Sequence, residues 1–228
     1  MPGWTCRRIS SVEKVVIQMV WRQRLLKLGV FIAGLIPLVI LAWQTVTGNL
    51  GANPIKEITE QTGIWVLRFV LITLAVTPAR RLTGWNRVIQ LRRMLGLFAF
   101  FYGGLHFVTY VWLDQFFMVQ EMMADVVARP FITVGFMSFV LLIPLAITST
   151  TKMIKRLGGK WWQRLHRTVY VVGIGGVVHY LWLVKADVQS PLTYGGLLVL
   201  LLGYRVWAAY GRRPKPVPRP QRQAAMST

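Results

Sequence analysis

The chain has 228 residues, of which 54% are hydrophobic and only 15% charged, and its mean hydropathy is +0.49. Because a soluble domain carries about 25% charged residues, this composition excludes an ordinary soluble protein and indicates a single polytopic membrane domain. The net charge of +20 would point to nucleic acid in a soluble chain, but here the positions of the charges report membrane topology.

Six hydrophobic blocks follow one another along the chain, and a helix that crosses the bilayer needs about 20 such residues. The blocks predict an all-α membrane protein, a bundle of six transmembrane helices at residues 28–46, 64–77, 94–113, 131–148, 165–184 and 192–210. The membrane domain is therefore expected at residues 28–210, after a basic segment at 1–27 and before a Pro/Arg-rich, disordered tail at 211–228.

Two of the six blocks contain an arginine. The block at 64–77 is short and contains Arg68, and the block at 192–210 contains Arg205. An arginine near a helix end can extend its side chain to the membrane interface, so both blocks are retained as spans. This interpretation places Arg68 near the outer end of its helix.

The orientation follows from the basic residues. Nearly all of the 27 lysines and arginines lie in alternate segments, at residues 1–27, 78–93, 149–167 and 205–228. Basic segments mark the cytoplasmic side of a membrane, so both termini are expected in the cytoplasm. The expected partner is the lipid bilayer and not a nucleic acid, and the family resemblance described below implies that the membrane is the bacterial inner membrane.

Two of the three histidines fall at matched depth. His106 lies about 18 Å along the third predicted span and His179 about 21 Å along the fifth, and both spans run outward. Neutral imidazoles from two facing helices are typical axial ligands of a six-coordinate heme b, which transfers electrons and leaves no position for a substrate. The alternative is that each histidine only donates a hydrogen bond to a neighbouring helix.

His166 lies thirteen residues before His179, or about 20 Å along a helix, which would suit a second redox site on the inner side. On a straight helix, however, the two side chains would point about 140° apart. Glycines at 173, 175 and 176 could permit a bend there, and glycines at 103 and 104 are equally ambiguous beside His106. Alternatively, His166 simply caps its helix at the interface.

Several short stretches carry a family resemblance by their order and spacing. They are GANPI at 51–55, TG at 62–63, TLAVTP at 73–78, RR at 80–81, RRMLG at 92–96, LHF at 105–107 with Tyr110, RPFITVG at 129–135, LAITS at 145–149, WWQRLH at 161–166 and HY at 179–180. The pattern resembles the ferric-reductase-like transmembrane family, which includes the membrane parts of NADPH oxidases. It resembles more closely the MsrQ (YedZ) family of heme-binding membrane subunits.

The resemblance implies a partner and a donor. It implies a periplasmic molybdenum-cofactor (molybdopterin) enzyme that reduces methionine sulfoxide in oxidised envelope proteins, which is a reversible form of damage. It also implies electrons from the respiratory chain, with quinol or a flavin reductase as donor, and an association with FMN. The chain itself contains no nucleophile, acid/base pair or zinc motif, so we expect no catalytic residue on it.

The chain departs from the ferric-reductase-like pattern at one position. That family places two histidines on the third helix, but Arg92 stands fourteen residues before His106. Arginine stays protonated and is a poor ligand of iron. Arg92 is therefore a candidate for binding a heme propionate or a flavin phosphate, unless it only marks the cytoplasmic boundary.

The sequence thus predicts a membrane b-type cytochrome in which His106 and His179 hold one heme. His166 is a candidate for a second heme or another redox group, and Arg68 is a candidate partner of a propionate or an interfacial anchor. Two alternatives remain: a ferric-reductase-like or NADPH-oxidase-like electron carrier with another partner, and a non-redox transporter. A transporter would favour intramembrane carboxylates, and no acid lies inside a predicted span.

Overall fold

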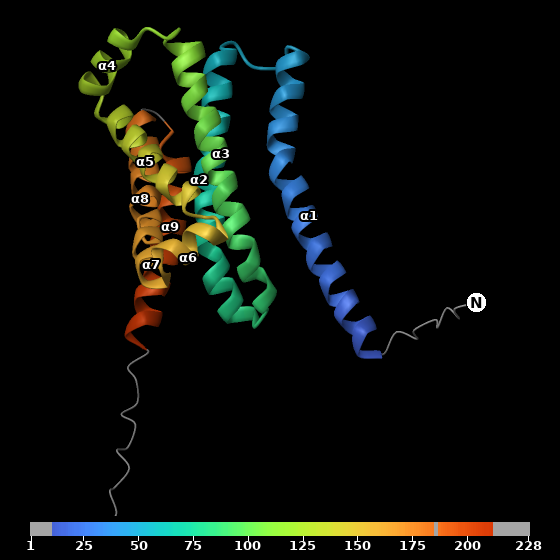
Figure 1. Ribbon diagram of the computed structural model, residues 1–228. Helices are drawn as coiled ribbons and strands as arrows, with labels where there is room; N and C mark the ends of the chain where they lie inside the picture. Colours follow the sequence, from blue (N-terminus) through green and yellow to red (C-terminus); the bar gives the residue numbers. More distant parts are fainter. Residues whose placement is uncertain (1–10, 185–186, 212–228) are drawn as a thin grey trace, which may run out of the picture.

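The computed structural model describes residues 11–184 and 187–211, and this part of the chain contains helices and connections but no strand (Figure 1). The longer helices are α1 (Ser11–Val46), α2 (Pro54–Thr83), α3 (Arg92–Thr109), α5 (Pro130–Ile147), α8 (Val169–Leu183) and α9 (Gln189–Tyr210). The shorter ones are η1 (Asn86–Leu91), η2 (Tyr110–Asp114), α4 (Val119–Ala128), α6 (Thr151–Leu157) and α7 (Gly159–His166). The tail expected to be disordered lies outside the described residues beyond Gly211.

Five helical segments in the described residues are long and apolar enough to cross a membrane. They are Val20–Val46, Pro54–Thr83, Asn86–Asp114, Pro130–Ile147 and Gln189–Tyr210. The single helix expected at 165–184 is wrong, because a break at Arg167 and Thr168 separates α7 from α8. Helix α8 has 15 residues and is about 22 Å long, which is shorter than a hydrocarbon core of about 30 Å. The sixth span stays a prediction.

Helix α2 is longer than the predicted block at 64–77. It begins after Asn53, whose side chain accepts a hydrogen bond from the Lys56 backbone N–H, and Pro54 occupies the first turn, where its missing N–H costs nothing. It ends at Gly84, which has a positive φ of 69°. Capping therefore set the ends of this helix, whereas the prediction followed hydrophobicity alone.

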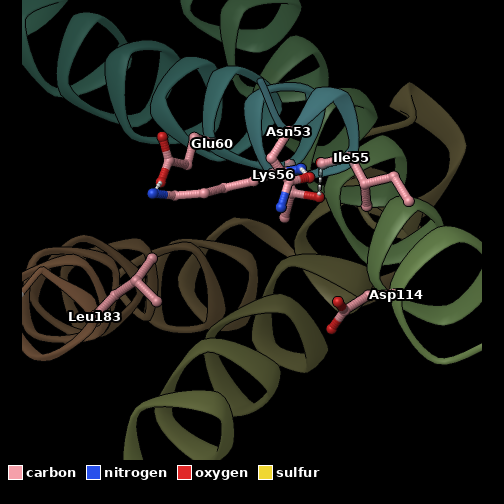
Figure 2. A pocket seen from close by; sticks show the side chains of 7 residues that line it. Asn53, Ile55, Lys56, Glu60, Asp114 and Leu183 are labelled. Carbon is pink, nitrogen blue, oxygen red and sulfur yellow. Dashed lines mark hydrogen bonds and ion pairs between the residues drawn. The ribbon is translucent and has the colours of Figure 1, made fainter. Parts of the chain in front are cut away.

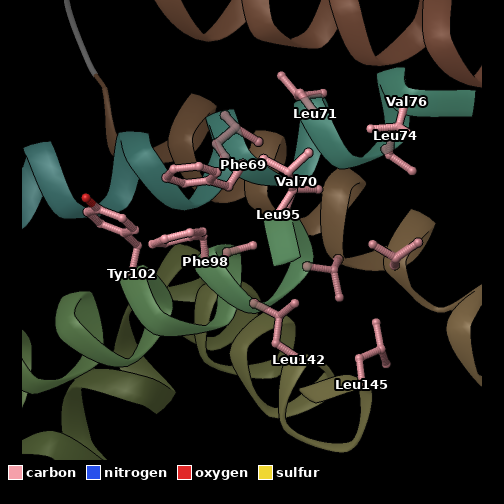
Figure 3. Packing of buried hydrophobic residues seen from close by; sticks show 14 of the residues in the cluster. Phe69, Val70, Leu71, Leu74, Val76, Leu95, Phe98, Tyr102, Leu142 and Leu145 are labelled. Atoms are coloured by element: carbon pink, nitrogen blue, oxygen red, sulfur yellow. The ribbon is translucent and has the colours of Figure 1, made fainter. Parts of the chain in front are cut away.

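Two helix pairs form the body of the bundle. Helix α2 packs along α3, α5 packs along α8, and α9 lies against α8 and α2 (Figure 1). Buried side chains from both pairs form one core, in which Phe69 stacks between Phe98 and Tyr102 (Figure 3). We call the end of the bundle with the α1–α2 connection and α4 the outer end, and the opposite end the inner end, after the predicted orientation.

Helix α1 stands apart from the other helices over much of its length in Figure 1 and is tied to α3 by hydrogen bonds next to Pro37. Pro37 has no N–H to donate within the helix, and at the next position of the ladder the buried Tyr102 hydroxyl lies between an N–H and a carbonyl of α1. This hydroxyl donates to the Gly34 carbonyl at 2.9 Å and accepts from the Leu38 N–H at 3.1 Å. The two bonds tie α1 to α3 near the middle of the bundle.

Candidate functional site

His106 lies near the outer end of α3 and faces α2. Its Nδ1 is 2.9 Å from the carbonyl oxygen of Thr59 and 3.4 Å from the hydroxyl of Thr62. The ring also rests against Gly63, where an added Cβ would come within 3.0 Å of the imidazole Cε1. A larger residue at this point would push the ring away from α2 by a few tenths of an ångström, so glycine favours the close approach.

His179 lies near the outer end of α8 and is held in the same way by α5. Its Nδ1 is 2.6 Å from the carbonyl oxygen of Phe131, and a Cβ added at Gly135 would lie 2.6 Å from that nitrogen. Both histidines therefore use a carbonyl and the glycine four residues later, on the neighbouring helix. We call the Thr59–Gly63 and Phe131–Gly135 arrangements the two glycine cradles.

The hydrogen bonds fix which ring nitrogen carries the proton. A carbonyl oxygen can only accept, so Nδ1 must be the donor in both His106 and His179. In a neutral imidazole the other nitrogen, Nε2, then has a free lone pair. An Nδ1–H bonded to a backbone carbonyl is the usual outer support of a histidine that binds a metal through Nε2.

The two rings are close enough to share one metal ion. Their centroids are 6.2 Å apart and their planes are inclined by 79°. Imidazole nitrogens bind transition metals at about 2 Å, and with about 1 Å from nitrogen to ring centre, two ligands on opposite sides of one ion have centroids about 6 Å apart. The spacing, the tautomers and the cradles are those that would let His106 and His179 hold one heme iron between them. Within the described residues, no group of three or more metal-binding side chains competes with this pair.

A cavity of about 370 Å³ opens at the outer end beside the pair (Figure 2). Thr59 lines it, so the backbone that supports His106 also reaches the outer surface. Lys56 and Glu60 form an ion pair of 3.6 Å at its wall, and Asp114 and Leu183 lie across from them. The charged Glu60 therefore lies next in the chain to Thr59, whose carbonyl accepts the hydrogen bond from His106.

His166 ends α7 at the inner end and is held differently. Its Nε2 is 3.1 Å from the Thr148 hydroxyl, and its ring stacks on Trp162 with centroids 4.0 Å apart. The Thr148 hydroxyl donates its proton to the Pro144 carbonyl, so it accepts from His166. Nε2 is thus protonated and occupied, and the free lone pair is on Nδ1. This arrangement therefore differs from that of the outer pair, in which Nε2 is the free nitrogen.

Two arginines, Arg92 and Arg205, lie at the inner end of the bundle. The Arg92 guanidinium, at the start of α3, is close enough to His166 and Arg205 for the charges to interact. Arg205 does not extend to the interface as the sequence predicted: its Nη2 donates to the Leu74 carbonyl at 2.8 Å and its Nη1 to the Tyr170 hydroxyl at 2.9 Å. The inner end therefore has one cation, Arg92, near His166 and a second, Arg205, held by α2 and α8.

The predicted position of Arg68 near the outer end of its helix is wrong. Because α2 begins at Pro54, Arg68 lies near the middle of a 30-residue helix. Its Nε donates to the Tyr194 hydroxyl at 2.9 Å, and its guanidinium carbon is 4.6 Å from the Trp65 ring centre. Arg68 is thus held inside the bundle by α9 and by an aromatic ring, between the outer pair and the inner site.

Comparison with known proteins decides the family. Residues 62–177 match the family described as "Ferric reductase like transmembrane component". A protein from Herminiimonas arsenicoxydans named "Protein-methionine-sulfoxide reductase heme-binding subunit MsrQ" is 58% identical over 193 residues, which cover 84% of this chain and 88% of that protein. The chain belongs to the MsrQ family. MsrQ proteins from Rhodospirillum rubrum and Xanthomonas campestris pv. campestris are 51% and 47% identical, covering 84% and 82% of this chain and 92% and 88% of theirs. No solved structure matches the chain significantly.

Membership of the MsrQ family confirms the resemblance found in the sequence. Together with the apolar helices, the transmembrane family makes this chain a multi-pass membrane protein. Sequence reasoning did not find the glycine cradles, because it considered glycines on the same helix as each histidine. Gly104 in fact meets nothing within 4 Å, and Gly103 packs against Phe139. The role of Arg205 had a signal in the sequence. Pro78 has no N–H to donate to the Leu74 carbonyl, and Arg205 donates to that carbonyl instead.

Proposed function

We propose that this MsrQ-family chain is a membrane b-type cytochrome that carries electrons to a periplasmic methionine-sulfoxide reductase. The relatives are named heme-binding subunits of such a system. In this proposal the partner contains a molybdenum cofactor and carries out the sulfoxide chemistry. Electrons come from the respiratory chain, from quinol or through a flavin reductase and FMN.

The observation that carries the proposal is the matched support of His106 and His179, whose ring centres are 6.2 Å apart. A bound heme would supply one-electron transfer at this position. The chain supplies the ligand nitrogens, keeps them unprotonated through the Nδ1–H bonds to Thr59 and Phe131, and fixes the ring planes through Gly63 and Gly135.

The inner site supports a second redox group less directly. His179 lies about 15 Å along α8 from Val169, and His166 lies before that residue at the inner end, so a redox group there would shorten the path of an electron from the inner leaflet to the outer heme. His166 offers only Nδ1, and Arg92 is no iron ligand. We therefore propose that the inner site holds a flavin or a weakly ligated heme and not a second six-coordinate heme.

A ferric-reductase-like electron carrier with a different partner is the second candidate. The match of residues 62–177 to the ferric-reductase-like family supports electron transfer, but it does not say which molecule accepts the electron. The two candidates differ only in what accepts the electron, so reconstitution separates them. The chain alone should reduce no methionine sulfoxide, and turnover should begin when the periplasmic enzyme and a reduced donor are added. Turnover by the chain alone would reveal a catalytic site on it.

The orientation requires a separate test. A reporter fused after Thr228 should be active in the cytoplasm and one fused near Gln120 in the periplasm, because the basic segments lie on the side of the termini. The opposite pattern would put the histidine pair on the cytoplasmic side and end the periplasmic proposal.

A visible spectrum of the purified full-length protein is the decisive measurement. The proposal predicts a Soret band and a sharp α-band on reduction, with a low-spin signal from two histidine ligands. A colourless protein, prepared with heme available in the host, would refute the cytochrome and favour a transporter.

A further inference from the structure

Methionines gather at the outer end of the bundle. Of the nine methionines in the chain, Met118, Met122 and Met123 lie within six residues of one another. Met118 precedes the first turn of α4 and the other two belong to that helix, which lies between the candidate spans Asn86–Asp114 and Pro130–Ile147 (Figure 1). Helix α4 also carries two carboxylates, which are costly inside the hydrocarbon, so this segment lies at the water side of the membrane.

Two of these three side chains are open to the surroundings. Met118 is 46% exposed and Met123 is 61% exposed, whereas Met122 is half-buried. Met123 lies four residues from both Val119 and Val127, which are 67% and 82% exposed, so the three form one face of α4 that no described residue covers. A thioether on this face meets any oxidant dissolved in the water outside the membrane.

Helix α4 is fixed beside the support of His179. The hydroxyl of Thr133, inside the Phe131–Gly135 cradle, donates a hydrogen bond to the Val126 carbonyl of α4. The exposed thioethers therefore lie at the end of the bundle where the proposed function has electrons leave for the reductase.

We propose that Met118 and Met123 are oxidation sites of this chain and that their sulfoxides are substrates of the reductase that the chain serves. In the first step, one thioether and one molecule of hypochlorous acid give one sulfoxide, one proton and one chloride ion. The sulfur loses two electrons and the chlorine gains them. In the second step, two electrons and two protons convert the sulfoxide back to the thioether and one water molecule. The second step rests on the proposed function, because these electrons reach the sulfoxide through the periplasmic enzyme.

The chain offers two matched controls for the first step. Met122 is on the same helix as Met123 but is half-buried. Met137 is 53% exposed, as much as the two proposed sites, but it belongs to α5 inside a candidate span and therefore faces lipid. Because oxidation of methionine by a dissolved reagent requires access from water, both controls should react more slowly.

The first experiment treats the full-length protein in nanodiscs with N-chlorotaurine, a charged chloramine of the same oxidant class that stays in water. Peptide mass spectrometry follows the gain of one oxygen atom at each methionine. Met118 and Met123 should be oxidised about tenfold faster than Met122 and Met137, or more. The double variant Met118→Leu, Met123→Leu keeps the side-chain volumes and should lose the rapid phase of oxygen uptake by the intact protein, whereas Met122→Leu should keep it. Equal oxidation rates at Met122 or Met137 would overturn the first step.

The second experiment supplies the oxidised protein with the periplasmic enzyme and a chemically reduced viologen, so that repair does not depend on electron delivery by the chain itself. A free peptide that contains methionine sulfoxide is present in the same reaction. At least about half of the sulfoxide at Met118 and Met123 should return to the thioether, since an enzyme selective for one of the two sulfoxide epimers leaves the other. Reduction of the free peptide while both protein sulfoxides persist would overturn the second step.

A last arm replaces the viologen by a reduced quinone and so separates the two proposals. Repair at both sites with viologen but not with the quinone would refute electron delivery by this chain and leave Met118 and Met123 as substrates. Repair with both donors supports the two proposals together.

Discussion

The outer pair and the inner site hold histidines in opposite tautomers. His106 and His179 donate from Nδ1 to backbone carbonyls and keep Nε2 free, whereas His166 donates from Nε2 to a threonine hydroxyl. The outer supports are neutral backbone groups and glycines, whereas the inner histidine has an aromatic ring stacked on it and the cation Arg92 near it. The difference teaches that the outer histidines leave Nε2 free for a metal ion, whereas the Nε2 of His166 is engaged in a hydrogen bond.

The largest expected effect tests whether only the outer end binds heme through two histidines. Replacing His106 or His179 by Ala should abolish the low-spin heme spectrum, because one remaining ligand cannot maintain six-coordination. His166→Ala should leave that spectrum unchanged. The measurement is heme content and absorbance of each purified variant, normalised to protein. Loss of the dominant heme in His166→Ala alone would reverse the comparison.

A second, smaller effect tests the glycine cradles. An alanine Cβ at Gly135 would lie 2.6 Å from His179 Nδ1, and one at Gly63 would lie 3.0 Å from His106 Cε1. Overpacking of this kind costs about 1–3 kcal/mol, so Gly135→Ala should weaken heme retention by about tenfold or more and Gly63→Ala by less. The paramagnetic resonance of the low-spin iron should shift in both, because the imidazole planes rotate.

Gly104→Ala is the control for the cradles. Gly104 is two residues from His106 on the same helix, and a Cβ there meets nothing within 4 Å. Its heme content and resonance signal should match those of the unaltered protein. Equal losses in Gly104→Ala and Gly135→Ala would mean that any added methyl group disturbs these helices, and the cradles would lose their special role.

The smallest effect is expected at the inner end. Thr148→Val removes the acceptor of His166 Nε2 and should lower the free energy of unfolding by about 1 kcal/mol, the usual net value of such a hydrogen bond. Thermal unfolding followed by circular dichroism measures this change. The outer heme spectrum should not move. A change in heme content in Thr148→Val would show that the inner site also ligates heme.

Much of the site could be anticipated from the sequence because depth along a helix is a local property. Counting residues at 1.5 Å each placed His106 and His179 at similar heights, and the structure brings their rings together. The same counting failed for His166, since it assumed one straight helix where the chain breaks at Arg167 and Thr168. The angle of about 140° between the His166 and His179 side chains was derived for one straight helix, so it does not apply to this chain.

Hydrophobicity by itself determined that this chain is a multi-pass helical membrane protein, because a long apolar segment must satisfy its backbone within itself in lipid. It could not place the ends of α2, which capping by Asn53 and Gly84 decided, and so it misplaced Arg68. Only the tertiary structure decided which carbonyls and glycines hold the histidines. It also decided that Arg205 donates to the Leu74 carbonyl, which Pro78 leaves without a helical donor. These contacts join residues far apart in the chain, and no periodicity or spacing within one helix can report them.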